Sequence, residues 1–439
     1  MYRYAIKSLE CWKSSPYRKP LIVQGARQVG KTWLMKEFGR TAYDDTAYIN
    51  FDGNEMMSAL FTGDMDVRRI LSGLELYLGR KIVPGKTLLV FDEVQEVPKA
   101  LASLKYFCEN APEFHIVCAG SLLGLALHPN TSFPVGKVDF LRLGPLTFTE
   151  FLMAAGKTAY AEAIDDGDFT AMAPFHVAYV DALKRYYFVG GMPEAVSRYV
   201  QGDDMLGVRE VQRRILMAYE QDFSKHAPND VVPKIRMVWN SVPAQLAREN
   251  RKFTYGLVRQ GARARDLETA IMWLSDCGLV HRVTRITAPR LPLRAYEDPK
   301  AFKLYMLDVG LLSCMSGLRG RTLLDGNALF TEFKGALTEQ YVLQQLKAQG
   351  GMDVHYYTND RGSCEVDFVI DDGETVVPME VKAEENLRSK SLAAFREKFS
   401  PGIAVRTSMS PYREQEGLVN IPLYAVGALP GVVRRLVPR

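Results

Sequence analysis

One stretch constrains the fold of this chain more than any other: Gly25 to Thr32, which directly follows the apolar run Leu21–Val23. Two glycines separated by four residues are followed at once by lysine and threonine, which is the spacing of a phosphate-binding loop. In such a loop the glycines let the backbone wrap closely around an anion, and the loop leads into a helix whose first N–H groups attract negative charge. The sequence therefore predicts a strand, this loop and a helix in succession.

The loop predicts an ATP site with bound Mg²⁺. Lys31 would reach the β- and γ-phosphates and act in catalysis, while the Thr32 hydroxyl would be a ligand of Mg²⁺. The alternative is a glycine-rich turn that fits the pattern by chance. The residues expected to surround the phosphates are Gly25, Ala26, Arg27, Gln28, Val29, Gly30, Lys31 and Thr32.

Length and composition limit what else the chain can be. At 439 residues it predicts about three domains, and its 47% hydrophobic and 24% charged residues are typical of globular proteins. A net charge of +4 means that a nucleic-acid surface would be a local patch. The scattered cysteines and histidines predict neither a zinc site nor a disulfide framework. Without a signal-peptide core or a span-length apolar window, we expect a cytoplasmic protein with no membrane partner.

Alternating strand-like and helix-like segments predict a parallel sheet covered by helices in the first domain. Within it, the apolar run Thr87–Phe91 ends in Asp92 and Glu93, the Walker B arrangement, at the sheet edge where ligands bind. Asp92 would hold the Mg²⁺ shell, and Glu93 would orient and polarise the attacking water. The alternative is an acidic strand end that caps a helix.

Two more strands are predicted in this domain, at His115–Ala119 and Val138–Leu143. Ser121, just after the first of these, is either a sensor of the γ-phosphate or an ordinary helix N-cap. After the second strand, Thr147 and Glu150 have the spacing of a capping box, which predicts that a helix begins there.

A second set of chemical residues lies near the C-terminus. Asp367 lies in a predicted strand, and Glu380 and Lys382 lie in the next strand, after a hairpin turn at 371–373. Because side chains alternate along a strand, the three share one face and resemble the core of PD-(D/E)xK nucleases. Glu339, on the predicted helix 331–349, matches the helix acid of that superfamily. The resemblance implies a divalent metal held by Glu339, Asp367 and Glu380, with Lys382 positioning the nucleophile.

Several segments together are similar to the prokaryotic ATPases of the AAA superfamily that carry a C-terminal domain of formerly unknown function. The resemblance rests on residues 24–32, 91–95, 119–121, 145–151 and 302–312. Where that family usually has Gly-Arg, this chain has Gly136-Lys137, and lysine lacks the planar fork of an arginine finger. Arg142 and Arg185 remain candidate phosphate sensors, with solvated or ion-paired arginines as the alternative.

Between these regions the sequence predicts helices and a small DNA-binding module. The turn Gly190–Pro193 would serve a lid over the nucleotide or be purely structural. Residues 209–225 predict a long, charged amphipathic helix that forms the solvated face of a bundle. A helical pattern from Arg263, a stop at Gly278 and an alternating segment to Ile286 are typical of a winged helix. Arg259, Arg263 and Arg265 would contact DNA phosphates, unless the module only packs internally.

The predicted α/β architecture has four parts: an AAA-type P-loop domain (1–155), a helical lid (156–230), a winged-helix module (231–287) and a restriction-endonuclease-like α/β domain (288–439). The predicted function is Mg²⁺-dependent ATP hydrolysis that controls a nuclease-like domain acting on DNA. The alternatives are a nucleotide-dependent switch that binds DNA or protein without cleavage, and a protein-interaction ATPase with an inert scaffold. An oligomer is compatible with the sequence, as is a monomer.

Overall fold

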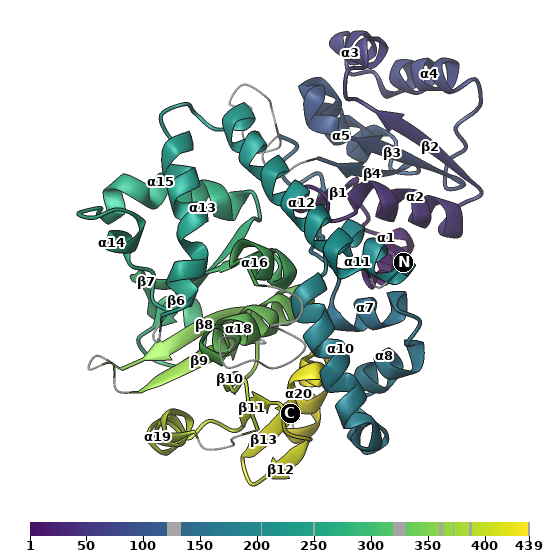
Figure 1. Cartoon of the computed structure of the whole chain (residues 1–439). Helices are drawn as coiled ribbons and strands as arrows, with labels where there is room; N and C mark the ends of the chain where they lie inside the picture. The colour runs from purple at the N-terminus through teal and green to yellow at the C-terminus, as the bar shows by residue number, and fades with distance from the viewer. Residues whose placement is uncertain are drawn as a thin grey trace. The chain divides into compact units, whose positions relative to one another are not determined.

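The computed structural model describes residues 1–120, 133–202, 204–248, 251–318, 331–359, 362, 364–371, 373–385 and 389–437, without the side chains of 331 and 332. The chain forms two compact units (Figure 1). The N-terminal unit contains Arg3–Gly144 and Asp276–Gly278. The C-terminal unit contains Met1–Tyr2, Pro145–Ser275 and Leu279–Arg439.

A five-stranded parallel sheet forms the centre of the N-terminal unit, in the order β2-β3-β4-β1-β5. Buried side chains of the sheet, such as Ile49 and Phe91, pack in one cluster with Phe61, Ile70 and Leu104 from the helices. Because β4 lies between β1 and β3, one strand separates the strand before the loop from the strand that ends in acids. The elements are α1 (Ala5–Ser14), β1 (Leu21–Gln24), α2 (Lys31–Ala42), β2 (Asp45–Asn50), α3 (Glu55–Thr62), α4 (Val67–Leu78), β3 (Thr87–Asp92), η1 (Val94–Glu96), α5 (Pro98–Asn110), β4 (His115–Ala119) and β5 (Asp139–Arg142).

The predicted strand, loop and helix succession is confirmed, as is the predicted parallel sheet. Strand β4 has the predicted bounds, and β5 is one residue shorter at each end than the predicted 138–143. The capping box is also confirmed in the C-terminal unit, where the Thr147 side chain accepts from the Glu150 N–H and the Glu150 carboxylate accepts from the Thr147 N–H.

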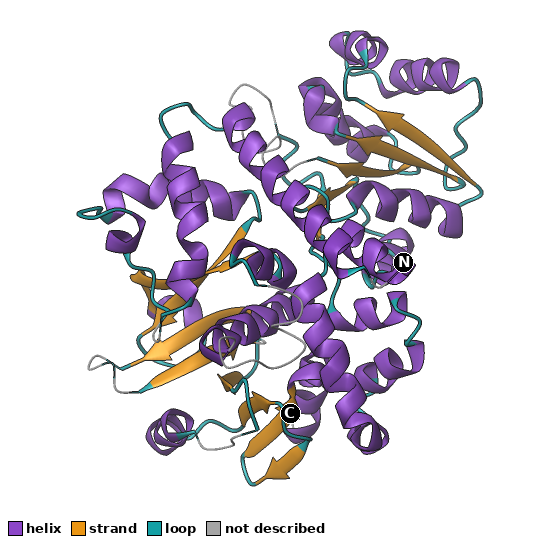
Figure 2. Ribbon diagram, viewed as in Figure 1, coloured by secondary structure: helices purple, strands orange, loops and turns teal. Residues whose placement is uncertain are grey.

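The C-terminal unit combines a helical part with a mixed sheet (Figure 2). The sheet has eight strands in the order β12-β13-β11-β10-β9-β8-β6-β7. Its first helices are α7 (Phe148–Ala154), α8 (Thr158–Asp165), α9 (Phe169–Met172), η2 (Ala173–Phe175), α10 (His176–Val189), α11 (Pro193–Gly202), α12 (Met205–His226), α13 (Val232–Leu246), α14 (Tyr255–Val258) and α15 (Ala264–Asp276). Then follow β6 (Val280–Ile286), η3 (Leu293–Tyr296), β7 (Glu297–Met306), α16 (Val309–Met315), α18 (Thr331–Ala348), β8 (Asp353–Thr358), β9 (Glu365–Asp371), β10 (Val376–Val381), α19 (Lys390–Phe399), β11 (Ala404–Ser408), β12 (Arg413–Gln415), β13 (Leu418–Pro422), η5 (Leu423–Ala428) and α20 (Leu429–Leu436).

The strand predicted as the wing of a winged helix belongs to this large sheet. Strand β6 pairs antiparallel with β7 and parallel with β8, so it is continuous with the strands that follow it. The predicted module boundary at residue 287 therefore falls between two neighbouring strands of one sheet. The winged-helix module itself stays a prediction.

Helix α12 is the charged amphipathic helix predicted at 209–225, and it extends further at both ends. Arg213, Arg214 and Met217 are exposed, but Arg209 on another side of the helix is buried. The guanidinium of Arg209 donates to Gln212 Oε1 at 2.7 Å and to the Leu318 carbonyl at 2.8 Å, and it stacks on the Phe188 ring. The charge pattern did not reveal this side, because a paired arginine can be buried where a lone one cannot.

Asp308, which is fully buried, joins the turn after α10 to the start of α16. One of its carboxylate oxygens accepts from the Gly191 N–H at 2.6 Å and from Gln344 Nε2 at 3.1 Å. The other accepts from the Leu311 N–H at 3.0 Å and caps α16. A Cβ added at Gly310 would lie 2.6 Å from the Gly190 nitrogen, so only glycine allows this approach. The turn at 190–193 thus has a structural role within the unit.

Among the residues that the structure describes, no helix is long and apolar enough to cross a membrane.

Candidate functional site

The predicted phosphate-binding loop lies between β1 and α2, and its backbone has the conformation that such a loop needs. Gln28 and Gly30 have positive φ angles of 65° and 94°, which turn the chain tightly before α2 begins at Lys31. At Gly25 a Cβ would lie 2.2 Å from the Leu143 carbonyl oxygen, so a side chain there would collide with the backbone. Both glycines of the motif are therefore required by local geometry.

Lys31 is almost completely buried, with 9% of its surface exposed. Its Nζ donates to the carbonyl oxygens of Gly25 and Ala26 at 3.0 and 2.9 Å. Burial lowers the pKa of Lys31 to about 8, although the nearby carboxylates of Glu93 and Asp92 favour the charged form. The ammonium is thus held inside the loop, where an anion is expected to bind.

We expect ATP binding to depend on pH through Lys31. Phosphate favours the protonated lysine, so ATP binding above pH 8 must be accompanied by proton uptake, and the affinity should fall by up to about tenfold per pH unit there. Well below pH 8 the lysine is already charged, and this dependence should vanish. Calorimetric titration in two buffers of different ionisation enthalpy at pH 9 measures the uptake. In Lys31→Met it should be absent, and equal heats for the wild type in both buffers would contradict the prediction.

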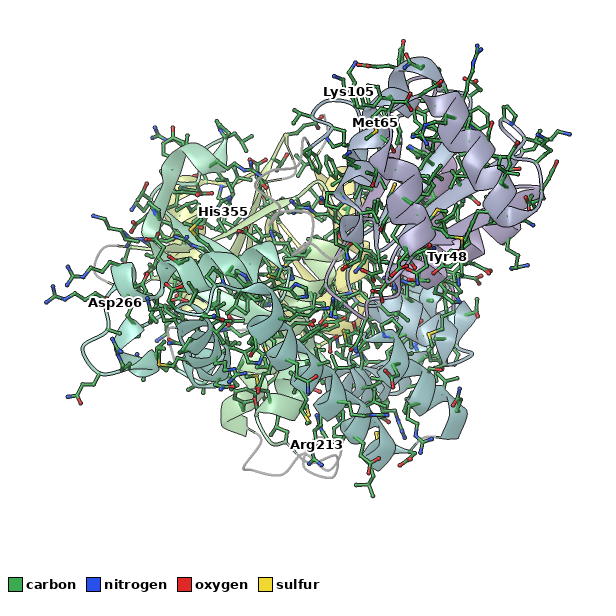
Figure 3. All side chains as sticks on the ribbon, turned by 90° about the horizontal axis from the view of Figure 1, so that it is seen from above. Tyr48, Met65, Lys105, Arg213, Asp266 and His355 are labelled. Atoms are coloured by element: carbon green, nitrogen blue, oxygen red, sulfur yellow. The ribbon has the colours of Figure 1, made fainter. Side chains whose placement is uncertain are left out.

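Thr32 and Asp92, the two residues predicted to hold magnesium, are in contact. The Thr32 hydroxyl donates to Asp92 Oδ2 at 2.7 Å, although the two residues are far apart in the sequence. Tyr48 on β2, labelled in Figure 3, donates its hydroxyl to the same oxygen at 2.9 Å. A hydroxyl and a buried carboxylate are the hard oxygen ligands that Mg²⁺ prefers, so these residues fit the ion.

Glu93 follows Asp92 in an unusual backbone conformation. Its φ angle of 52° is left-handed, which is uncommon for a residue with a side chain. Its carboxylate accepts from Gln95 Nε2 at 2.6 Å. Strained residues of this kind cluster at active sites, where the surrounding structure holds them in place.

Three residues near the loop were not predicted. Tyr48 contacts Asp92 because β2 pairs with β3, and sequence alone does not give that pairing. Arg3 is buried and donates to the Val29 carbonyl at 3.0 Å and to the Gly144 carbonyl at 2.7 Å, so it braces the loop from the N-terminus of the chain. Gln95 lies within segment 91–95, which carries part of the family resemblance, but no role was predicted for it. Its position two residues after Glu93 was the available signal.

Of the other residues considered for nucleotide contacts, the structure describes Lys137 and Arg142 but not Ser121. Ser121, the sensor candidate, lies outside the described residues. Lys137 forms an ion pair with Glu109 at 2.9 Å, and Arg142 is exposed on β5. The roles of the site residues as phosphate and metal contacts stay predictions.

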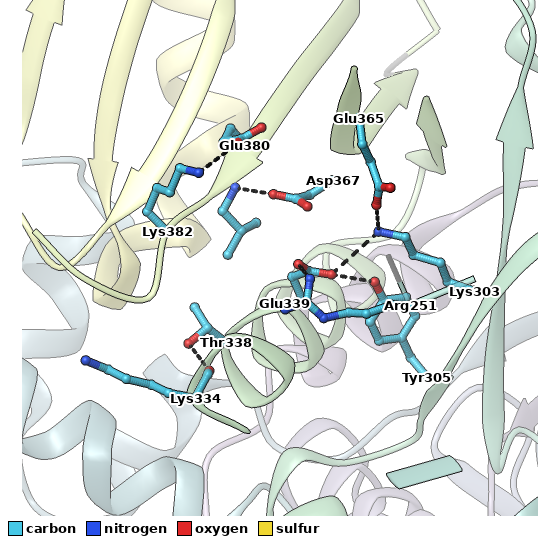
Figure 4. A network of polar contacts seen from close by, with 11 residues as sticks. Arg251, Lys303, Tyr305, Lys334, Thr338, Glu339, Glu365, Asp367, Glu380 and Lys382 are labelled. Carbon is cyan, nitrogen blue, oxygen red and sulfur yellow. Dashed lines mark hydrogen bonds and ion pairs between the residues drawn. The ribbon is translucent and has the colours of Figure 1, made fainter. Parts of the chain in front are cut away.

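In the C-terminal unit, Asp367 and Glu380 lie on the neighbouring antiparallel strands β9 and β10, as the hairpin pattern predicted (Figure 4). Asp367 Oδ2 accepts from the Val381 N–H at 2.8 Å. Glu380 is paired with Lys382 Nζ at 2.7 Å, and its other oxygen, Oε2, is buried without a hydrogen-bond partner among the described residues. The three predicted residues are therefore close in space.

Glu339 on α18 contacts two cations as well as the predicted partner acid Asp367. Arg251 and Lys303 both pair with its carboxylate, Lys303 at 3.8 Å, and the Tyr305 hydroxyl donates to it at 2.9 Å (Figure 4). Lys303 has no exposed surface and also pairs with Glu365 at 2.6 Å. Positive charge inside the cluster is thus supplied by the protein itself.

The pKa values within the cluster follow from burial and these neighbours. Burial raises the pKa of Asp367 well above its usual value, and the carboxylates of Glu339 and Glu380 raise it further. Burial would also raise the pKa of Glu339, but Arg251 and Lys303 hold it below its usual value. In the described part of the chain, no group of three or more His, Cys, Asp or Glu side chains is arranged to hold a metal ion. The metal roles of Glu339, Asp367 and Glu380 stay predictions.

A parallel sheet with a phosphate-binding loop after β1 and an acid pair at the end of β3 defines a P-loop nucleotide-binding domain. Consistently, residues 17–152 match the family model described as AAA domain, so this segment is similar to AAA-type P-loop domains. Residues 180–322 and 334–426 match two families described as domains of unknown function, DUF8612 and DUF4143.

Among curated proteins, none matches this chain. Several solved structures do. The Walker-type ATPase PABY2304 of Pyrococcus abyssi is 15% identical, with 71% of this chain and 94% of that chain covered and a TM-score of 0.43. The Aeropyrum pernix Orc1 protein in complex with DNA is 14% identical, with 71% and 90% covered and a TM-score of 0.27. The Thermotoga maritima RuvB Holliday junction branch migration motor is 17% identical, with 64% and 90% covered and a TM-score of 0.29. These TM-scores are too low to indicate a shared fold over the whole chain.

Proposed function

We propose that the N-terminal unit binds ATP with Mg²⁺ and hydrolyses it. The observation that carries the proposal is the contact of 2.7 Å between the Thr32 hydroxyl and an Asp92 carboxylate oxygen. These two groups come from α2 and the end of β3, and they are the protein ligands that a P-loop enzyme uses for Mg²⁺. Thr32 and Asp92 would hold Mg²⁺, which would neutralise negative charge on the phosphates during hydrolysis.

Each residue near this contact would have one role in hydrolysis. Lys31 would turn from the loop carbonyls to the β- and γ-phosphates, because an anion is a better partner for its ammonium. Tyr48 would hold Asp92 in place through its hydroxyl. Glu93 would orient the attacking water and accept its proton. The loop backbone from Gly25 to Thr32 would surround the phosphates.

The proposal includes DNA as a partner of the C-terminal unit. Arg259, Arg263 and Arg265 are exposed around the start of α15, and Arg265 makes only a loose ion pair with Asp266 at 4.0 Å. Exposed guanidinium groups that gather in one segment can neutralise phosphates and release counterions. These arginines would therefore bind the phosphates of a nucleic acid without recognising its base sequence.

For the acidic cluster, the geometry favours the alternative in which DNA or protein is bound without cleavage. Glu339 does not fit a metal ligand, because Arg251, Lys303 and Tyr305 already occupy its carboxylate. Only Asp367 and Glu380 would remain, and Glu380 is paired with Lys382. A nucleotide-dependent switch is thus the second part of the proposal, and the cluster is a structural core of that switch.

One set of measurements on the purified full-length protein tests both parts. We expect ATP hydrolysis with Mg²⁺ that stops with EDTA, and DNA binding that differs between ATP and ADP and weakens with salt. Replacing Arg259, Arg263 and Arg265 by glutamine should reduce the slope of log affinity against log salt by about 2.7, at about 0.9 per phosphate contact. A matched variant with glutamine at the exposed Arg68, Lys99 and Lys105 should keep the slope.

The outcomes separate the parts of the proposal. Failure to hydrolyse ATP would refute the first part. An unchanged salt slope in the triple arginine variant would refute the DNA surface. Products of DNA cleavage with Mg²⁺ or Mn²⁺ that disappear in Lys382→Ala would show that the cluster is a nuclease and not a structural core.

A further inference from the structure

Gln95 is a buried polar residue beside Glu93 that the roles above do not use. It lies in η1, the short 3₁₀ turn directly after β3, and only 4% of its surface is exposed. Its Nε2 lies 2.6 Å from Glu93 Oε2, which is a short hydrogen bond between a neutral donor and a carboxylate. The side chain is therefore fixed against the residue expected to activate water.

The chemistry of this contact decides how the Gln95 amide is oriented. A carboxylate of an ionised glutamate can only accept hydrogen bonds, so the amide must present its NH₂ group to Glu93. Its carbonyl oxygen, Oε1, then faces away from the Glu93 oxygen that it holds. Gln95 Oε1 is buried and has no hydrogen-bond partner among the described residues.

A buried carbonyl oxygen without a partner is uncommon in proteins, so the missing donor to Gln95 Oε1 calls for an explanation. Backbone geometry fixes the place of this oxygen. Glu93 is left-handed, with φ of 52°, and the Glu96 N–H donates to the Glu93 carbonyl at 3.0 Å, which closes the turn around Gln95. The turn thus holds the Glu93 carboxylate and the Gln95 amide as one unit at the end of β3.

We infer that Gln95 orients the attacking water together with Glu93. The inference rests on the proposed ATP hydrolysis and names a further residue for it. One hydrogen of the water would donate to Glu93, and the other would donate to Gln95 Oε1, which leaves a lone pair of the water oxygen directed at the γ-phosphorus.

The step balances without any further reactant. As the water oxygen bonds to the γ-phosphorus, the bond from that phosphorus to the oxygen bridging the β-phosphate breaks. Glu93 takes one proton of the water, and the other hydrogen stays on the oxygen that joins the phosphate. ADP and phosphate then leave, and Glu93 returns its proton to the solvent. Gln95 gains and loses no proton, and its contribution is to fix the water and the carboxylate in one geometry.

Gln95 could instead hold Glu93 away from the water. The two roles are distinguished by kcat, which should fall on substitution of Gln95 if it orients the water and rise if it restrains Glu93. We expect Gln95→Leu to lower kcat about 30- to 100-fold, with KM for ATP within about threefold of the wild type, because the nucleotide contacts are untouched. Gln95→Glu keeps the shape of the side chain but places a second carboxylate against Glu93, so it should lose kcat as severely. Glu96→Gln, an exposed change in the same turn, should leave both constants unchanged.

The experiment measures steady-state ATP hydrolysis and the melting temperature of the wild type and these variants, with Glu93→Gln beside them. The inference is overturned if Gln95→Leu and Gln95→Glu hydrolyse ATP at the wild-type rate or faster. It is also overturned if the loss of kcat is matched by weaker ATP binding and a lower melting temperature, because that marks a structural role. If the wild type does not hydrolyse ATP, or if Glu93→Gln is fully active, the proposed function fails first, and the two failures are thereby told apart.

Discussion

Glu93→Gln should bind ATP as the wild type does and hydrolyse it about 10²- to 10⁴-fold more slowly, the range attributed to a lost general base. Glutamine keeps the size of the side chain but cannot accept the proton of the attacking water. Lys31, Thr32 and Asp92 are unchanged, so the affinity for the nucleotide should stay within about threefold. Single-turnover hydrolysis gives the chemical rate, and binding of a fluorescent ATP analogue gives the affinity.

The matched control for this variant is Glu96→Gln. Glu96 lies at the end of the same 3₁₀ turn and is exposed, so the same chemical change there should leave the hydrolysis rate equal to that of the wild type. A Glu93→Gln protein that hydrolyses ATP normally would mean that another group accepts the proton. A variant that loses ATP binding would mean that Glu93 supports the loop.

Asp308→Ala should destabilise the C-terminal unit by about 4 kcal/mol, which is among the largest effects of single substitutions. The change removes a fully buried acceptor and leaves the N–H groups of Gly191 and Leu311 and the amide of Gln344 without this partner. It also removes the cap of α16. Chemical denaturation followed by far-UV circular dichroism measures the shift of the unfolding midpoint.

Asp168→Ala is the control for Asp308→Ala. Asp168 also caps a helix, accepting from the Ala171 N–H at 2.9 Å, but it is exposed, so water replaces the lost hydrogen bond. Its loss should cost only about 1 kcal/mol. Equal denaturation midpoints for Asp308→Ala and Asp168→Ala would contradict the prediction that the buried Asp308 contributes more stability than the exposed Asp168.

The local structure around the candidate nucleotide site was predicted from short segments of sequence. Residues 25–32 specify a loop by spacing alone, and an apolar run ending in Asp92 and Glu93 specifies a buried strand with acids at its end. Tyr48 could not be predicted in the same way. Its contact with Asp92 depends on β2 pairing with β3, which is a property of the sheet and not of either segment.

For the acidic cluster the same reasoning predicted the hairpin but not its surroundings. The alternation along β9 and β10 placed Asp367 and Glu380 near one another, as found. Arg251 and Lys303 reach Glu339 from segments 88 and 36 residues away. A pattern within one hairpin cannot report cations that arrive from elsewhere in the chain, and they decide whether an acid is available to a metal.

The continuity of β6 and β7 with the other strands of the large sheet also guides how the protein should be divided for experiments. A fragment beginning at residue 288 would lack β6, so β7 would lose the strand that joins it to the sheet and β8 would keep only β9 as a neighbour. Unpaired strand edges promote aggregation. A fragment beginning at Pro145 keeps all eight strands together. Soluble pieces suitable for crystallisation or NMR should therefore come from a cut before Pro145.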